Sequence, residues 1–382
     1  MEKFVEFIKK CYESQYVVFI NKLIAEKTPC GYFAPFIPTD QQINAVNEFR
    51  RIGINLTTIL TTSENFPDAP ADLKIVHLSN RENEQLPKYF FNVGTFPAAI
   101  MIPWFLDHGI EPVAIEETEN TSWNAGFYFE HMPEIFEVYQ DLDEVSQDVL
   151  LGYILGIISN RYSFCKYSEN QQYILDGFIP KPGEVVIDAG VCDGSTSSMF
   201  ADFGCRVIGF EMDSENYKIA SKLAEKKNFV VENLGLGDEN KSASYTHSEY
   251  NIGGSFIDDK GNSKTQLVTL DSYVQEHHLD SVDFIKMDTE GAELSILKGA
   301  TNTITRFKPK LALSVYHKPE DIFTLYQFLK SIRPDYEFAF RHYVTTAEYA
   351  PAVFHDGMAK YCHTFDLPMR MCGFAKVVLF AR

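Results

Sequence analysis

The feature that most constrains the fold is an alternation of apolar strands and amphipathic helices over residues 181–332. The predicted strands are Val185–Asp188, Arg206–Glu211, Phe229–Glu232, Val282–Asp288 and Lys310–Tyr316. The predicted helices are Ser195–Phe203, Asn216–Lys227, Leu294–Arg306 and Glu320–Ile332. Five such repeats predict an α/β fold with a doubly wound, mostly parallel sheet. Tyr336–Tyr343 and Lys376–Ala381 are expected to add an edge hairpin with one antiparallel member.

The first predicted strand runs into a glycine-rich turn that suits a ligand. Gly190 and Gly194 follow the strand, and a helix is predicted from Ser195. Glycine lets a backbone approach a ligand closely, and the first N–H groups of a helix are free donors in the same space. We expect ligand binding here, although an ordinary strand-to-helix turn has the same pattern. The expected binding residues are Asp188, Gly190, Cys192, Asp193, Gly194, Ser195 and Thr196.

An acid after the second predicted strand narrows the class of ligand. Glu211 and its neighbour Met212 lie roughly twenty residues beyond Gly190, where a carboxylate can accept both hydroxyls of a ribose. NAD and S-adenosyl-L-methionine both offer that ribose. The dinucleotide pattern G-x-G-x-x-G is absent, because Cys192 takes its third position, and Asp193 would repel a pyrophosphate. A cationic ligand suits these acids better, so S-adenosyl-L-methionine is the predicted cofactor.

Polar residues also follow the other three predicted strands. Asn233, Leu234 and Gly235 are expected to hold an adenine edge, with a plain glycine turn as an equal alternative. Asp288 follows the fourth strand and His317 the fifth. Because the carboxyl ends of parallel strands meet at one edge, we expect Asp288 to bind the cofactor. Asp288 or His317 would then act as the general base, although a lone histidine can equally be structural.

Four more residues on this rim are expected to line an acceptor cleft, with rim packing as the alternative: Glu290, Tyr316, His342 and Tyr343. No metal is predicted, because His277-His278 and Cys362-His363 lack a matching second pair. Asp288, Glu290 and His317 are the alternative ligands for a divalent ion. Motifs of phosphate-loop NTPases, zincins and serine hydrolases are absent.

The first half of the chain predicts a second, smaller α/β domain. Helical spacing indicates a first helix that ends near Thr28, and Gly31–Pro38 is expected to be a connector. A helix at Gln41–Arg51 precedes short strands at Ile54–Leu60, Lys74–Leu78, Tyr89–Val93 and Ile110–Ile115. Only Gly94 remains of a dinucleotide fingerprint in this part, and Met132–Asn160 predicts two helices. We therefore expect four parts: 1–38, a helix and connector; 39–131, a small degenerate Rossmann-like domain; 132–180, a helical connector; and 181–382, the cofactor-binding domain.

The composition limits the partners and the compartment. The 382 residues include 53 acidic and 34 basic ones, a formal charge of -19, so binding to nucleic acid or an anionic membrane is disfavoured. No apolar stretch reaches the ~20 residues of a membrane span. Seven scattered cysteines without a C-x-x-C pair indicate reduced thiols in a cytoplasmic protein.

The ordered motifs support one resemblance. DAGVCDGST, IGFEMD, NLGLGD, VTLDSYV, FIKMDTEGAELSILKGA, LALSVYHKPEDIFTLYQFL and RHY follow one another between Glu184 and Tyr343. This part of the chain resembles the FkbM-type family of S-adenosylmethionine-dependent methyltransferases, in its longer subgroup with an amino-terminal Rossmann-like module. The resemblance implies a class I methyltransferase fold, with the cofactor surrounded by Asp188, Gly190, Glu211 and Asp288.

The resemblance also implies the reaction, because many members methylate hydroxyl groups of sugars or natural products. We expect an O-methyltransferase that acts on a small-molecule or glycan acceptor, with no nucleic-acid or membrane partner. Oligomerisation is left open. The alternatives are an NAD-dependent oxidoreductase or epimerase, and a non-catalytic nucleotide-binding protein with the same fold.

Overall fold

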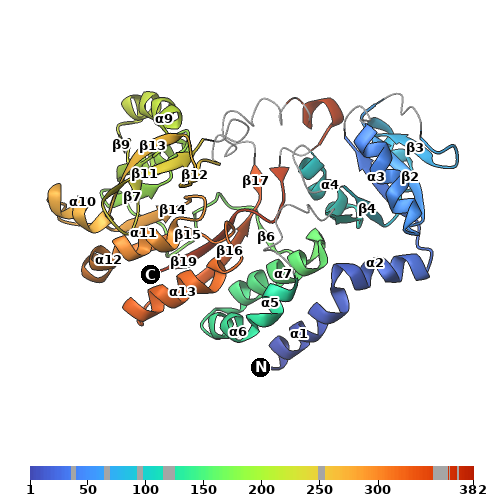
Figure 1. Ribbon diagram of the computed structural model, residues 1–382, viewed down its shortest axis with the longest axis horizontal. Coiled ribbons are helices and arrows are strands. Elements are labelled where there is room, and N and C mark those ends of the chain that lie inside the picture. Colours follow the sequence, from blue (N-terminus) through green and yellow to red (C-terminus); the bar gives the residue numbers. More distant parts are fainter. Residues whose placement is uncertain are drawn as a thin grey trace.

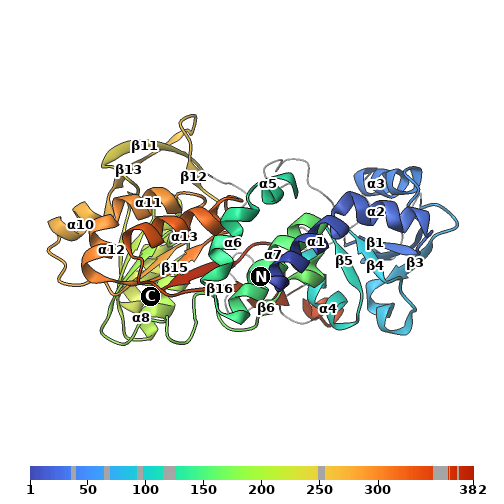
Figure 2. The same ribbon diagram turned by 90° about the horizontal axis from the view of Figure 1, so that it is seen from below.

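The computed structural model describes residues 1–35, 40–63, 69–92, 98–114, 125–247, 254–346, 360, 362–367 and 370–382. Within these residues the chain forms two main parallel sheets at opposite ends of an elongated molecule, and a group of helices lies between them (Figure 1). Figure 2 shows the same arrangement from below, with α1 (Glu2–Ser14) and α7 (Glu144–Ser159) side by side near the middle.

The larger sheet has eight strands in the order β6-β16-β19-β15-β14-β7-β8-β9. Their bounds are Tyr167–Ser168 (β6), Val185–Ala189 (β7), Arg206–Phe210 (β8), Val230–Glu232 (β9), Phe284–Met287 (β14), Lys310–Ser314 (β15), Phe338–Tyr343 (β16) and Val377–Ala381 (β19). β19 is antiparallel to both of its neighbours, and every other pair is parallel. The predicted mostly parallel α/β sheet is confirmed.

Helices cover both faces of this sheet, as a doubly wound fold requires. They are α8 (Ser195–Asp202), α9 (Ser214–Lys227), α10 (Leu270–Glu276), α11 (Glu293–Gly299), α12 (Thr301–Phe307) and α13 (Asp321–Ile332). Alternate residues of β7 belong to different cores: Ile187 packs in the core that includes Leu325 of α13, and Val186 packs in the one that includes Phe200 of α8.

Two expectations for this half need correction. β16 and β19 pair antiparallel as predicted, but they form no edge, because β19 lies between β15 and β16 and β6 is the edge strand. All five residues of β19 are buried, which suits an interior strand. The single helix predicted at Leu294–Arg306 is broken near Gly299, where a Cβ would lie 2.0 Å from the Gly237 carbonyl oxygen.

A small sheet beside the larger one was not predicted. Its order is β10-β13-β11-β12, with bounds Gly235–Leu236 (β10), Lys241–Thr246 (β11), Phe256–Ile257 (β12) and Ser263–Val268 (β13). These strands are short, and most residues of β11, β12 and β13 are exposed or only partly buried, so their sequences carry little apolar signal. A further two-stranded pair joins β17 (Thr345–Thr346) and β18 (Arg370–Met371).

The smaller domain has a five-stranded, all-parallel sheet in the order β3-β2-β1-β4-β5. The strands are Cys30–Ala34 (β1), Leu56–Thr61 (β2), Lys74–His77 (β3), Tyr89–Phe91 (β4) and Glu111–Val113 (β5). Its helices are α2 (Tyr16–Ala25), α3 (Asp40–Arg51), α4 (Met101–Asp107), and the 3-10 turns η1 (Leu78–Asn83) and η2 (Ala98–Ile100).

The expected connector at Gly31–Pro38 is wrong for its first residues, because β1 is the central strand of this sheet. All of β1 is buried, and a Cβ on Gly31 would lie 2.4 Å from the Phe90 ring. Flanking prolines and a run of only five residues hid this strand. The single amino-terminal helix is also two helices, because Gln15 is extended between α1 and α2.

The two sheets are joined by helices that include α5 (Ala125–Glu130), α6 (Met132–Gln140) and α7, followed by the 3-10 turn η3 (Tyr162–Phe164). The side chain of Asp143 caps α7 by accepting from Ser146 N–H, and twelve of its 16 residues are buried. The described helices include none long and apolar enough to cross a membrane. The four-part division of the chain stays a prediction.

Candidate active site

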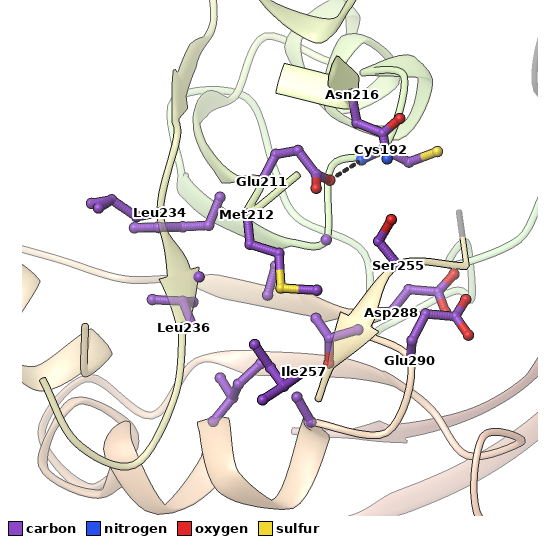
Figure 3. Close-up of a pocket in the computed structure, with 17 residues that line it drawn as sticks. Cys192, Glu211, Met212, Asn216, Leu234, Leu236, Ser255, Ile257, Asp288 and Glu290 are labelled. Atoms are coloured by element: carbon purple, nitrogen blue, oxygen red, sulfur yellow. Dashed lines mark hydrogen bonds between the residues drawn. The ribbon is translucent and has the colours of Figure 1, made fainter. Parts of the chain in front are cut away.

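A pocket opens at the carboxyl ends of β7, β8 and β14, where the sheet order changes direction (Figure 3). It is lined by Ala189, Gly190, Cys192, Phe210, Glu211, Met212, Asn216, Leu234, Gly235, Leu236, Ser255, Ile257, Asp288, Thr289, Glu290, Ala292 and Ile296. Seven predicted cofactor residues are among them: Gly190, Cys192, Glu211, Met212, Leu234, Gly235 and Asp288. The sequence analysis therefore predicted residues of one pocket that lie up to 98 positions apart in the chain, from Gly190 to Asp288.

Position 190 requires a glycine because of its backbone conformation and its close contact with the chain after β14. It has φ +81°, and a Cβ there would lie 2.0 Å from the backbone oxygen of Asp288. The first loop and the end of β14 are therefore in direct backbone contact, which leaves no room for any other residue.

Asp188 is fully buried and does not line the pocket. Its carboxylate pairs with Lys286 Nζ at 2.8 Å and accepts a hydrogen bond from Ser197 Oγ at 2.6 Å. Lys286 also donates to the Gly190 carbonyl at 2.6 Å. Asp188 thus acts on the pocket through Lys286, which holds the Gly190 loop against β14. The sequence signal that could have indicated this role is a lysine inside an otherwise apolar strand.

The second half of the predicted loop lies away from the pocket lining. Asp193 Oδ1 accepts from the N–H and the hydroxyl of Ser195, at 3.0 and 2.7 Å, at the start of α8. Gly194 packs against α9, with Ala220 Cα 3.3 Å from the position of a Cβ, and Thr196 also lies outside the lining. Asn233 donates to the Glu211 carbonyl at 2.9 Å and not into the pocket. These residues shape the loops around the site, and a ligand contact for them stays a prediction.

Glu211 lies in the pocket wall, where its carboxylate is fixed by two backbone donors. Oε2 accepts from Cys192 N–H at 2.7 Å and Oε1 from Asp213 N–H at 2.8 Å. Burial raises the pKa of Glu211 to about 7, although these hydrogen bonds oppose the rise. Burial also raises the pKa of Cys192 to about 12, so that side chain is a thiol and not a nucleophile.

Asp288 is held from several directions. Tyr173 and Tyr316 donate hydroxyl hydrogen bonds to its two oxygens, at 2.6 and 2.8 Å. His317 Nε2 lies 3.2 Å from Oδ1, and Lys376 Nζ lies 3.8 Å from Oδ2. Burial alone would raise the pKa of Asp288, but Lys376 and His317 outweigh it and hold the pKa well below the usual range. Its carboxylate is therefore a weak base.

His317 lies between carboxylates and is 6% exposed. Its Nδ1 is 2.8 Å from Glu293 Oε1, and its Nε2 also approaches Glu290 at 3.7 Å. Burial alone would lower the pKa of His317, but the hydrogen bonds to Asp288 and Glu293 raise it to about 10. An imidazolium at neutral pH has no lone pair to accept a proton, so this environment argues against the predicted base role.

Two residues of the predicted acceptor cleft are in the core and need correction. His342 is fully buried and its Nε2–H donates to the carbonyls of Gly373 and Ala375, at 2.8 and 3.0 Å. Tyr343 is 1% exposed and donates to the Ile174 carbonyl. Both residues of β16 looked polar enough to lie on the rim, but each donates to backbone carbonyls inside the fold. Tyr316 and Glu290 lie beside Asp288, and their place in an acceptor cleft stays a prediction.

Several site residues gave no usable sequence signal. Tyr173 precedes the first strand of the larger domain and Lys376 lies 88 positions after Asp288, so only the fold brings them together. Both have left-handed backbones, with φ 67° and 69°, as do Cys192 and Glu290 at φ 55° and 51°. Strained backbone of this kind gathers at functional sites. Ser255 and Ile257 come from the unpredicted small sheet.

The electrostatic character of the pocket is uniform. Three carboxylates line it, those of Glu211, Asp288 and Glu290, and the described lining residues include no lysine, arginine or histidine. Figure 3 shows Asp288 and Glu290 together, with Glu211 on a separate strand end. Such a pocket attracts a cation and repels a phosphate group.

The strand order and the place of the pocket define the class I, Rossmann-like methyltransferase fold. The sequence model of the methyltransferase FkbM domain matches residues 188–340, which include the loop after β7, the end of β14 and His317. This part of the chain is therefore an FkbM-type methyltransferase domain, and the resemblance that the motifs indicated is confirmed.

Solved structures extend the likeness to the whole fold. The crystal structure of methyltransferase FkbM from Methylobacillus flagellatus KT matches with a TM-score of 0.60 at 17% identity, over 99% of this chain and 98% of that one. A precorrin-6y C5,15-methyltransferase from Geobacter metallireducens GS-15 matches with a TM-score of 0.33 at 10% identity, over 57% and 94% of the chains. Fibrillarin from Aeropyrum pernix, solved with natively bound S-adenosyl-L-methionine, gives 0.28 at 12% identity, over 52% and 67%. A search of curated protein sequences finds no significant match.

Proposed function

We propose that this chain is an S-adenosyl-L-methionine-dependent methyltransferase that methylates a hydroxyl oxygen of a sugar, glycan or natural product. The observation that carries the proposal is the pocket of the FkbM-type domain, with three carboxylates and no cationic side chain among its described lining residues. The proposed cofactor has a sulfonium and an ammonium group, and both are positive. Carboxylates in a half-buried pocket stabilise such a ligand more than they would in water.

The pocket residues fit the parts of this cofactor. Glu211, at the end of β8, is the proposed partner of the ribose hydroxyls, and the apolar side chains of Leu234, Leu236 and Ile296 are the proposed adenine surface. Gly190 and Cys192 let the backbone of the first loop approach the ligand, and Met212 and Gly235 complete the wall. Asp288 is the proposed partner of the positive end. When bound, the cofactor supplies an electrophilic methyl group.

The chain's own contribution to the reaction is then mainly orientation and charge. Lys286 holds the Gly190 loop, and Tyr173, Tyr316 and Lys376 hold Asp288, so the acids keep their places when a ligand enters. A fixed pocket aligns the acceptor oxygen with the methyl group at little further entropic cost. We propose that Asp288 and His317 act in this positioning and not as the proton acceptor.

The two alternatives are less well supported. A nicotinamide cofactor has a pyrophosphate, which would face three carboxylates with no lysine or arginine among the described lining residues. A non-catalytic protein would not need the strained backbones that converge on Asp288. The overall charge of -19 supports a neutral acceptor over nucleic acid. The seven cysteines, all free thiols, support a cytoplasmic location.

The first experiment is calorimetric titration of the protein with adenosylhomocysteine and, separately, with NADH. We expect saturable binding of adenosylhomocysteine only. Glu211→Gln should weaken it about 10- to 100-fold, because a charged hydrogen-bond acceptor is replaced by a neutral one of the same shape. Glu239→Gln is the matched control, since Glu239 is exposed and pairs only with Lys241 among the described residues. No binding by the wild type would overturn the proposal, and binding of NADH alone would favour the oxidoreductase.

A further inference from the structure

We infer that the Glu290 carboxylate, and neither Asp288 nor His317, takes the proton from the acceptor hydroxyl during methyl transfer. This inference rests on the proposed function and adds to it the residue that touches the reacting atoms. It also changes the role of Glu290, which the sequence placed only in the lining of an acceptor cleft.

The position of Glu290 is the first argument. It lies two residues beyond Asp288 in the turn between β14 and α11, and its side chain lines the same pocket (Figure 3). The side chain is 34% exposed, against 18% for Asp288, so an acceptor from solvent can reach it. Of the two acids at this end of the pocket, Glu290 is the more accessible.

The backbone at Glu290 is the second argument. Glu290 has φ 51° and the following Gly291 has φ 92°, so two successive residues are left-handed. Glycine adopts this conformation freely, but a glutamate does so only when the surrounding structure imposes it. The turn therefore fixes the direction of the Glu290 side chain at some expense in stability, as happens at functional sites.

The bonding of the three candidates is the third argument. Asp288 accepts hydrogen bonds from Tyr173 and Tyr316 and lies next to two cationic groups, so its negative charge is stabilised and it is a weak proton acceptor. Both nitrogens of His317 face carboxylates, which favours the imidazolium. Among the described residues, the nearest cation to the Glu290 carboxylate is His317 Nε2, and at 3.7 Å it is beyond hydrogen-bond distance. Glu290 keeps its lone pairs for a ligand.

The acid strengths agree with this geometry. Burial raises the pKa of Glu290 above its usual value, and the charge of His317 limits the rise, whereas the pKa of Asp288 is lowered. Glu290 is thus the stronger base of the two carboxylates, and the positive charge of His317 favours its ionised form before the reaction.

The step balances without any other reactant. The acceptor oxygen forms a bond to the methyl carbon while the carbon–sulfur bond breaks, and the electron pair of that bond goes to the sulfur. The acceptor's O–H bond breaks and its proton goes to a Glu290 oxygen. The products are a methyl ether, a neutral thioether and a protonated Glu290, which returns its proton to solvent through its exposed side.

The test uses sinefungin, a stable cofactor analogue in which a carbon replaces the sulfonium sulfur and an amino group on that carbon replaces the methyl group, so no acceptor has to be known. Calorimetry gives the ratio of its affinity to that of adenosylhomocysteine. We expect the wild type to prefer sinefungin about 10-fold or more at pH 7.5, because an ammonium next to a free carboxylate forms a charge-assisted hydrogen bond. Glu290→Gln should bring the ratio near one, with adenosylhomocysteine affinity within about threefold of the wild type. Glu239→Gln should leave the ratio unchanged.

The pH dependence of the ratio tests the proton-accepting role itself. The wild-type preference should fall as the pH is lowered and Glu290 is protonated, and the fall should be absent in Glu290→Gln. An unchanged ratio in Glu290→Gln would overturn the inference, and so would a preference that Asp288→Asn removes and Glu290→Gln keeps. If the wild type binds no adenosylhomocysteine, the proposed function fails first. If adenosylhomocysteine binds but Glu290→Gln leaves the ratio of sinefungin to adenosylhomocysteine affinity unchanged, the Glu290 inference fails and the proposed function stands.

Discussion

The two parallel sheets of this molecule have the same strand order around their central strands but differ at the ends of those strands. In the larger sheet, β9-β8-β7-β14-β15 follow one another as β3-β2-β1-β4-β5 do in the smaller one. The penultimate residue of β7 is Asp188, and Glu211 and Asp288 follow β8 and β14. The three corresponding positions of the smaller sheet hold neutral residues.

The penultimate residue of β1 is Phe33, Thr62 follows β2, and Asn92 follows β4. Asn92 donates to the Phe33 carbonyl at 2.8 Å, so it closes the end of the sheet on itself. Among the described residues, the same topology therefore forms a carboxylate-lined pocket in one half and neutral strand ends in the other. The fold supplies the place for a site, and the residues at the strand ends decide whether a ligand binds there.

The largest expected effect comes from the buried lysine that only the larger sheet has. Lys286→Met leaves Asp188 charged and unpaired in the core, and we expect the free energy of unfolding to fall by about 3 to 5 kcal/mol. Adenosylhomocysteine binding should be lost as well, because Lys286 also holds the Gly190 carbonyl. Urea denaturation and calorimetry measure the two effects.

The control for Lys286→Met lies in a strand of the smaller sheet. Lys74 in β3 is about half exposed and pairs with Glu84, so Lys74→Met should change the free energy of unfolding by less than about 1 kcal/mol. A loss of similar size in the two variants would contradict the view that the larger sheet depends on a buried charge network and the smaller one does not.

The next effect is a pair of opposite pH dependences within the larger domain. The pKa of His317 is raised to about 10, so its contribution to stability is full below about pH 6.5 and is lost as the pH rises toward 10. Burial lowers the pKa of His342 to about 4, so its contribution is full above about pH 6.5 and is lost as the pH falls toward 4. Each loss should be about 2 to 4 kcal/mol.

The measurement is the difference in unfolding free energy between the wild type and each of His317→Gln and His342→Gln, by urea denaturation from pH 4 to pH 10. The difference for His317→Gln should shrink at high pH and that for His342→Gln at low pH. Parallel curves would mean that the carboxylates around His317 do not hold it as the imidazolium. Both histidines belong to the larger domain, His342 in β16 and His317 in the loop after β15, so each serves as the control for the other.

Most of the fold and about half of the site follow from patterns that the sequence contains. The five strands of the larger sheet between Val185 and Ser314 were predicted within two residues, because strands of a parallel sheet tend to be continuous apolar runs. Gly190, Glu211 and Asp288 were predicted because they stand where such strands end. β1 was missed, since its five residues between two prolines have no periodicity to distinguish them from a connector.

The rest of the site depends on contacts that no local pattern encodes. Tyr173 and Lys376 reach Asp288 only through the fold: Tyr173 lies in the connector before β7, and Lys376 directly precedes β19, which is separated from β14 by β15. The protonation of His317 depends on Glu293, which looked like an ordinary acid in the first turn of a helix. The sequence also suggests that the segment Thr345–Cys372 covers the acceptor site, with a packed extension as the alternative. Its residues Phe354, His355, Met358 and Tyr361 lie outside the described residues, so this stays a prediction.

The smallest expected change in stability comes from adding one methyl group to a glycine at each sheet, and the two variants should differ in their effect on ligand binding. Gly190→Ala and Gly31→Ala each place a methyl group at the central strand pair of a sheet, where the Cβ would lie 2.0 Å from the Asp288 carbonyl oxygen and 2.4 Å from the Phe90 ring. Both variants should lose about 1 to 3 kcal/mol of unfolding free energy through overpacking.

Only Gly190→Ala should also weaken adenosylhomocysteine binding, by about 100-fold or more, because the backbone that must move there is part of the pocket. In Gly31→Ala the Phe90 ring can shift inside the core of the smaller domain, and the affinity should stay within about twofold of the wild type. Equal losses of affinity in the two variants would show that the smaller sheet also controls the pocket. The two halves would then differ in position and not in function.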